Sequence, residues 1–331
     1  MISFRFHVVS ITAVFLAIAI GIVVGSTYVD GAVVDGLRNR IKSVSDNLDE
    51  RKTENDRLEG ELGTARTYID SSADFAVSGR LVDVPVLLVA VRGVDEGAVE
   101  RVALLSRRAG GTVPGVVWLE PKWALEGEDR AQLAEIVGAR PGATPEVLWA
   151  SAWEGVVDEL TAVPVDTGPG DAAAPDSQET TTTIPPAAVS EVLGGLEAGG
   201  FLSVDSLDDA SSSLTDLAGT TPSFLLLTGP RARDEVVPML PVVIEAVVQG
   251  GLPTVVGDVH VDAPEAPGRG EALRELFAPE LLDAVVLVDD ADRSEGQVTA
   301  VLALDAAVDG LTGHFGYGDG ADGVLPSWTP P

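Results

Sequence analysis

The residues best placed for chemistry alternate in the segment GDVHVD, where single apolar residues separate Asp258, His260 and Asp262. This segment ends a predicted strand over 253–259, and side chains two positions apart point to the same face of a strand. A carboxylate beside an imidazole can bind a metal ion or transfer a proton. The alternative interpretation is a strand exit whose charged side chains only face water.

Other polar residues follow predicted strands, and ligands of open parallel sheets bind beyond the carboxyl ends of the strands. They are Arg92, Thr228, Arg231, Asp289 and Asp290. Backbone amides after Gly229 could receive an anion, but no Walker sequence or GxGxxG stands at a strand-to-helix turn, which argues against a nucleotide site. There is also no GxSxG elbow and no recognisable Ser-His-Asp arrangement. We therefore expect no catalytic residues, no enzymatic activity and no bound cofactor.

Ligands for soft metals are scarce, because the chain has no cysteine, three histidines and two methionines. Copper, zinc or iron would have to rely on imidazole, thioether or carboxylate groups. Met239 lies in an apolar helical segment typical of a core, and His314 follows a helix that it could cap. The predicted metal ligands are therefore His260, His314, Asp258 and Asp262.

Five short runs rich in Val and Leu, separated by helical patterns, predict the elements that must position these residues. Strands that are apolar throughout are buried on both faces, which is typical of parallel sheets. We therefore expect an α/β fold with a mainly parallel, doubly wound, Rossmann-like sheet. The predicted strands span 85–91, 112–119, 224–229, 253–259 and 284–290.

The expected α/β domain spans 80–310 and is followed by a glycine-rich tail over 311–331. Within it, 163–186 has almost no large apolar side chain and is predicted to be a disordered insertion. This insertion could instead separate two halves, but the helices on either side would then need separate cores. In the tail, GYGDGADG resembles a single copy of a calcium-binding repeat, and one copy favours a turn-rich segment.

The N-terminus contains 22 uncharged residues from Val8 to Val29. At about 1.5 Å per residue they span roughly 33 Å, enough to cross a bilayer. We predict a transmembrane signal-anchor over 8–29, a cytoplasmic tail over 1–7 and the bulk of the chain outside a cell membrane crossed once. Flanking Lys and Arg favour neither orientation, so the short tail before the span decides it. The alternative is a signal peptide cleaved near Gly25 and Ser26.

Residues 30–70 repeat apolar side chains at alternating steps of three and four, which predicts a coiled coil and a homodimer. If Val34 is an a position, Asn55 is also at a, where a lone Asn can set a parallel register. The alternative is an amphipathic helix that lies on its own globular domain. The expected dimer seam consists of Leu37, Ile41, Val44, Leu48, Asn55, Leu58 and Leu62.

The charge of the chain is strongly negative. Its 331 residues include 52 Asp and Glu against 21 Lys and Arg, a formal charge of −31. Such a surface repels phosphate, and no local basic patch offsets it, so we expect no nucleic-acid partner. The acidic excess can also serve solubility alone.

The opening MISFRFHVVSITAVFLAIAIGIVVGS, the heptads after it, the α/β body and the closing QVTAVLALDAAVDGLTGHFGYGDGADGVLPS together resemble the MctB-like copper transporter family of actinobacteria. The resemblance covers nearly the whole chain. It implies a membrane-anchored cell-envelope protein that contributes to copper export or homeostasis, with copper as a possible transported ion. Relatives are also linked to cell-wall hydrolase control at division. The alternative function is therefore a coiled-coil scaffold or adaptor that recruits or regulates such an envelope partner.

Overall fold

The computed structural model describes residues 4–162, 191–207, 214–263 and 265–326, and for residues 26–33, 191, 215 and 216 it describes the backbone alone. The chain divides into two compact units, Met1–Thr67 and Tyr68–Pro331. The insertion predicted at 163–186 lies outside the described residues, as does the end of the predicted tail from 327 onward.

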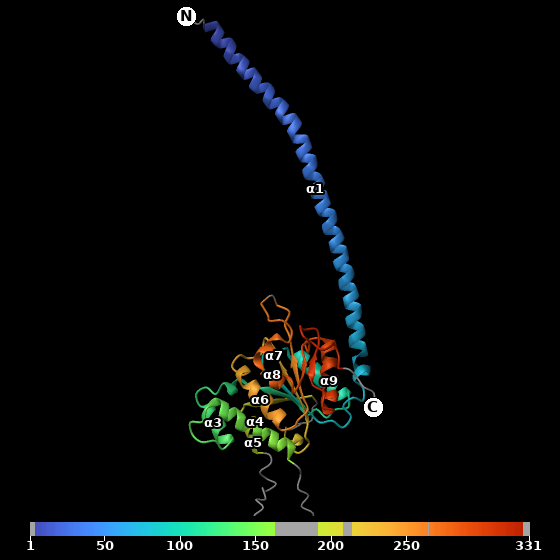
Figure 1. The fold of residues 1–331 in the computed structure, drawn as a ribbon, viewed down its shortest axis with the longest axis vertical. Coiled ribbons are helices and arrows are strands. Elements are labelled where there is room, and N and C mark those ends of the chain that lie inside the picture. Colours follow the sequence, from blue (N-terminus) through green and yellow to red (C-terminus); the bar gives the residue numbers. More distant parts are fainter. Residues whose placement is uncertain (1–3, 163–190, 208–213, 264, 327–331) are drawn as a thin grey trace, which may run out of the picture. The chain divides into compact units, whose positions relative to one another are not determined.

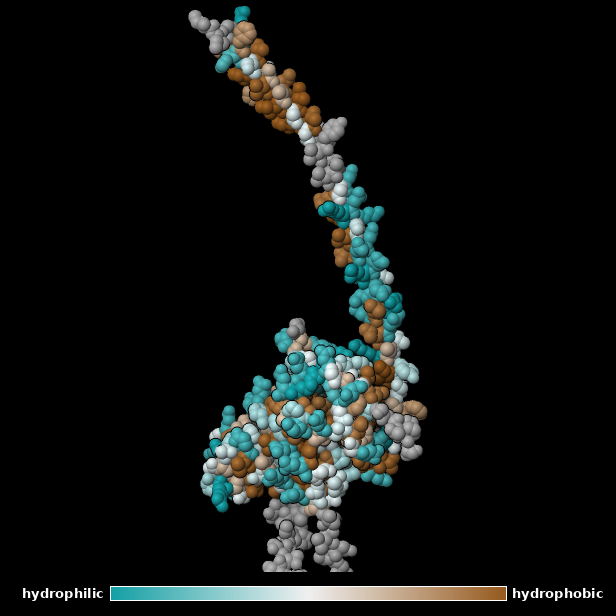
Figure 2. Space-filling view, in the orientation of Figure 1, coloured by the Kyte–Doolittle hydropathy of each residue, from teal (hydrophilic) through white to brown (hydrophobic). Residues whose placement is uncertain are grey.

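The first unit is the greater part of helix α1 (Phe4–Val77). Phe4–Gly25, of 22 residues, is long and apolar enough to cross a membrane, with a mean hydropathy of 2.7 over an 18-residue window, and Figure 2 shows it as the brown segment near the N-terminus. The predicted N-terminal apolar helix is therefore confirmed. It begins before the expected Val8 because Phe4 and Phe6 flank the single charge of Arg5.

The heptad positions of α1 lie exposed in the single chain. Leu37, Ile41, Val44, Leu48, Leu58 and Leu62 are each between 44% and 62% exposed. At the predicted a position, Asn55 donates from Nδ2 to Glu59 Oε1 at 2.7 Å within the same helix. The apolar face is thus available for a partner, and the coiled coil stays a prediction.

The second unit is built on one sheet, which among the described residues has the strand order β3-β2-β1-β4-β5-β6-β7. All neighbouring strands are parallel except the antiparallel pair β2 and β3, so the predicted mainly parallel sheet is confirmed. The order reverses between β1 and β4. The strands are β1 (Val86–Val91), β2 (Gly115–Leu119), β3 (Leu202–Ser206), β4 (Ser223–Thr228), β5 (Thr254–Asp258), β6 (Val286–Val288) and β7 (Gly313–Phe315).

Helices cover the sheet in two layers (Figure 1). In one layer α2 (Glu96–Arg108) packs against α9 (Ser294–Val308), and in the other α4 (Pro145–Thr161) packs against α6 (Leu240–Gln249). The connections through α2 (β1 to β2) and α6 (β4 to β5) run in opposite directions from the centre of the sheet, so right-handed crossovers place these two helices on opposite faces. Helix α9, between β6 and β7, lies on the face of α2. The remaining elements are α3 (Asp129–Ile136), α5 (Glu191–Ala198), α7 (Glu271–Leu276), α8 (Pro279–Leu282) and the 3-10 turns η1 (Pro121–Ala124), η2 (Leu214–Leu217) and η3 (Val237–Met239).

Two strands were not expected from the sequence. β3 is an edge strand whose last residues, Asp205 and Ser206, are exposed, so it lacks the apolar run by which the central strands are recognised. β7 has three residues and begins at Gly313. The sheet therefore continues past residue 310 into the segment expected to be a tail.

An aromatic cluster fills the core beside α4. The ring of Trp123 lies 6.1 Å from that of Trp153 and 5.3 Å from that of Phe201, and Trp153 meets Phe224 of β4 edge-on at 6.2 Å. Trp123 Nε1 donates to the carbonyl of Phe201 at 2.9 Å. These rings connect η1, α4, β4 and the residue that precedes β3.

We expect Trp153→Ala to lower the free energy of unfolding by about 3 to 5 kcal/mol, because the substitution leaves a cavity between the rings of Trp123 and Phe224. Val147→Ala, at a position of the same helix that is 51% exposed, should change it by less than about 0.5 kcal/mol. Urea unfolding followed by circular dichroism measures both. Equal effects of the two substitutions would contradict the burial of Trp153 in the aromatic cluster.

Candidate functional site

Acidic side chains gather at the carboxyl ends of β5 and β6. Asp258 is the last residue of β5, Asp289 and Asp290 follow β6, and all three are 0% exposed. Asp258 and Asp289 lie on neighbouring strands, since Gly257 pairs with Val288. The predicted strand-end residues therefore lie at the same edge of the sheet.

His260 stands between the two carboxylates with which it alternates in the sequence. Its Nδ1 is 3.8 Å from Asp258 Oδ2 and its Nε2 is 3.7 Å from Asp262 Oδ1. Both distances are too long for hydrogen bonds, and Nδ1 has no partner among the described residues. Burial and the nearby Arg269 lower the pKa of His260, so its imidazole is neutral at pH 7.

His314 pairs with a different carboxylate. Its Nε2 lies 2.7 Å from Asp289 Oδ2, which connects β7 to the end of β6. The same carboxylate accepts the backbone N–H groups of Tyr317 and Gly318, each at 2.8 Å. Burial alone would raise the pKa of Asp289, but the bonds from His314 and the two amides outweigh it and lower that pKa overall. His314 thus belongs to a strand and does not cap the helix before it.

Gly270 separates the two histidine pairs. Its amide donates to Asp258 Oδ2 at 2.9 Å, and a Cβ added to it would lie 3.1 Å from both Asp289 Cβ and His314 Nε2. Its backbone φ is +68°, a left-handed value that residues with a side chain rarely adopt. The four predicted metal ligands therefore form two separate groups, and nowhere in the described part of the chain do three His, Asp or Glu residues stand together as a metal site.

Arg269 neutralises the outer carboxylates. Its guanidinium, 11% exposed, contacts Asp292 at 2.7 Å and Asp262 at 3.2 Å. Arg293 also reaches Asp262, at 3.0 Å. Sequence reasoning missed Arg269, since the loop PGRGE that carries it has no pattern linking it to a strand end.

Two other predicted strand-end residues have clear positions. Arg92 is held in place, because its Nε donates to Glu120 Oε1 at 3.0 Å and its guanidinium lies 4.4 Å from the ring centroid of Trp118. Thr228 is the buried last residue of β4. Arg92 is therefore engaged by other residues, and Thr228 is buried, so neither side chain is free to bind a ligand.

Asp290 is the least satisfied carboxylate. Both of its oxygens are buried without a hydrogen-bond partner in the described residues. Burial, reinforced by the charge of Asp289, raises the pKa of Asp290 to about 7. Burial likewise raises the pKa of Asp258 to about 6, against the hydrogen bond from Gly270. Asp290 therefore carries a proton for part of the time at neutral pH.

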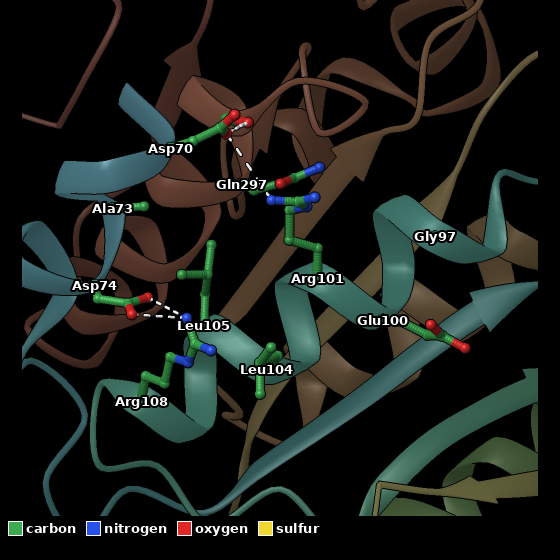
Figure 3. Close-up of a pocket in the computed structure, with 11 residues that line it drawn as sticks. Asp70, Ala73, Asp74, Gly97, Glu100, Arg101, Leu104, Leu105, Arg108 and Gln297 are labelled. Atoms are coloured by element: carbon green, nitrogen blue, oxygen red, sulfur yellow. Dashed lines mark hydrogen bonds and ion pairs between the residues drawn. The ribbon is translucent and has the colours of Figure 1, made fainter. Parts of the chain in front are cut away.

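A cavity of about 440 Å³ lies among the last turns of α1, α2 and the start of α9. Figure 3 shows Asp74 beside Arg108 and Asp70 facing Arg101 across it, and their ion pairs measure 2.5 and 3.9 Å. Ser294 also donates to Asp70. These contacts fasten the end of α1, from Tyr68 onward, to α2 and α9.

We expect the contribution of Asp290 to the free energy of unfolding to fall as pH rises from about 4 to about 7. A carboxyl whose pKa is raised by folding favours the folded state while it keeps its proton and loses that contribution on ionising. Asp290→Asn should stabilise the protein at pH 8, by an amount on the order of 4 kcal/mol at most, and much less at pH 5. Urea unfolding at both pH values measures this, with exposed Asp283→Asn as the control. A gain of the same size at both pH values would contradict the assignment.

Comparison with known proteins places the whole chain in one family. The family described as "Copper transport outer membrane protein, MctB" matches residues 1–326. Proteins named "Copper transporter MctB" from Mycobacterium bovis and Mycobacterium tuberculosis are 25% identical over 339 residues, covering 99% of this chain and 100% of theirs. Because the family match spans nearly the full length, from the apolar helix to the segment after β7, the chain belongs to the MctB family.

Proposed function

We propose that this protein is a membrane-anchored, non-enzymatic component of copper transport or homeostasis in the cell envelope. The observation that carries the proposal is the family match over residues 1–326, together with full-length relatives named copper transporters. The apolar helix Phe4–Gly25 supplies the anchor. The bulk of the chain then lies on the extracytoplasmic side, with a few residues before the anchor.

Copper is the cargo in this proposal, and the acidic chain attracts it. A formal charge of −31 raises the local concentration of cations around the protein. Among the predicted ligands, His260 is best placed to contact the ion. Its Nδ1 and Asp258 Oδ1 are both buried without partners in the described residues, and neutral imidazole is a good copper ligand. His314 is already engaged by Asp289.

A second proposal concerns assembly. The exposed seam of α1 favours a parallel homodimer, whose paired helices would form a scaffold between the anchor and the sheet unit for an envelope partner. Seven seam positions between Leu37 and Leu62 follow heptad spacing, six of them apolar and exposed. Burying such a stripe in a second copy removes apolar surface from water, at about 25 cal/mol per Å².

Titration of the full chain in detergent with Cu²⁺ tests the copper contact. We expect saturable binding that His260→Ala weakens at least ten-fold, since the substitution removes the unpartnered imidazole. His314→Ala is the matched control and should weaken binding less than three-fold, whatever it does to stability. Absence of saturable binding, or equal loss in the two variants, would show that the chain handles copper without this contact.

Sedimentation of the full chain in detergent tests the homodimer. Leu48→Asp with Leu58→Asp should convert the dimer to monomers, because each charge would be buried against its copy in the seam. The control carries the same two added charges at positions facing away from the seam, Thr53→Asp with Gly60→Asp, and should stay dimeric. An unchanged mass for the seam variant would contradict the coiled-coil homodimer.

A further inference from the structure

A second crevice of about 440 Å³ lies beyond the carboxyl ends of the strands. Its walls come from residues that follow four different strands: Gly97 and Ala98 after β1, Arg231 after β4, His260 after β5 and Gln297 after β6. The strand order reverses between β1 and β4, and open parallel sheets bind ligands at this point. The crevice therefore has the position of a ligand site, although the sequence has no nucleotide motif.

Two arginines that line the crevice have no close anionic partner among the described residues. Arg231 is exposed, and the structure records no ion pair for it within the described residues. Arg101, on the first half of α2, reaches only Asp70, at 3.9 Å. The first turns of α2 and α9 also line the crevice, and the N-terminal end of a helix favours anions. Guanidinium groups bind carboxylate and phosphate in the same bidentate manner.

Two of the three acidic residues of the crevice are already paired with an arginine that does not line it, and the third caps a helix. Asp95 caps α2 by accepting the amide of Ala98 at 3.0 Å. Asp262 and Asp292 are bound to Arg269 at 3.2 and 2.7 Å. The cations left without a close partner are thus Arg231 and, in part, Arg101.

Two buried acceptors complete the lining. Gln297 is 3% exposed, its Nε2 donates to the carbonyl of Ala291 at 3.4 Å, and its Oε1 has no partner in the described part of the chain. The side chain of His260 is 8% exposed, with Nδ1 equally unpartnered, and an imidazole nitrogen without a proton accepts a hydrogen bond. Leaving a buried acceptor unsatisfied is costly, so a ligand that brings hydroxyl donors gains by meeting these atoms.

We propose that this crevice binds a small hydroxylated anion, a sugar phosphate or a uronic acid, with its anionic group on Arg231 and Arg101 and its hydroxyl groups on Gln297 and His260. The site shares His260 with the proposed copper contact, but the two arginines that would hold the anion, Arg231 and Arg101, have no part in that contact. Phosphate and carboxylate share the recognition by guanidinium, and the choice between them is made by experiment.

Calorimetric titration of the full, metal-free chain in detergent tests the site, with glucose 6-phosphate, glucuronate, glucose and inorganic phosphate as probes. We expect at least one of the two anionic sugars to bind, and at least ten times more tightly than glucose or inorganic phosphate. Arg231→Gln should weaken that binding at least ten-fold. Arg233→Gln removes a neighbouring exposed arginine that does not line the crevice and should leave it unchanged.

Gln297→Met separates the two halves of the recognition. It should lower the affinity for the anionic sugar towards that for the corresponding simple anion. Arg231→Gln should leave the Cu²⁺ titration unchanged. The proposal is overturned if neither anionic sugar binds at 10 mM, if glucose or inorganic phosphate binds as tightly as the tighter-binding anionic sugar, or if the Arg231 and Arg233 variants behave alike. Because the copper titration is read independently, either proposal can fail alone.

Discussion

Burying a carboxylate costs free energy unless hydrogen bonds or a proton compensate it, and the sheet unit buries Asp258, Asp289 and Asp290 side by side. Each is compensated differently. Asp289 receives His314 and two amides and stays ionised, Asp258 receives one amide, and Asp290 has no donor and shifts its pKa towards neutrality. The loop of Gly270, strand β7 and the chain after it take their places because they supply these donors.

The central fold could be predicted because its information is local. Each strand from β1 to β6 except β3 is a run of apolar side chains buried on both faces, and the pattern alone requires helices on either side. β3 and β7 could not be predicted in this way. Strand β3 ends in exposed polar residues, and β7 has only three residues and is held by a hydrogen bond from His314 to a residue 25 positions earlier, which no local pattern records.

The candidate site was predictable to the same extent. Alternation placed His260 between Asp258 and Asp262, as the structure has it. Arg269, Gly270 and Gln297 were missed, because their roles arise from distant strands that meet at one edge. His314 was chosen by residue type alone, and the backbone of Gly270 keeps it apart from His260. Residue type and spacing thus find the strand ends, and tertiary contacts decide which of them share a ligand.

The donor to Asp258 is a main-chain amide, which no exchange of neighbouring side chains can remove while the turn keeps its shape. The turn also favours glycine, since a Cβ at position 270 would lie 3.1 Å from both Asp289 Cβ and His314 Nε2 and the backbone there has a left-handed φ of +68°. At the carboxyl ends of β5 and β6, position 270 is therefore one where substitution is restricted by lack of space. The charged loop residues around it can be exchanged as long as each carboxylate keeps a cation nearby.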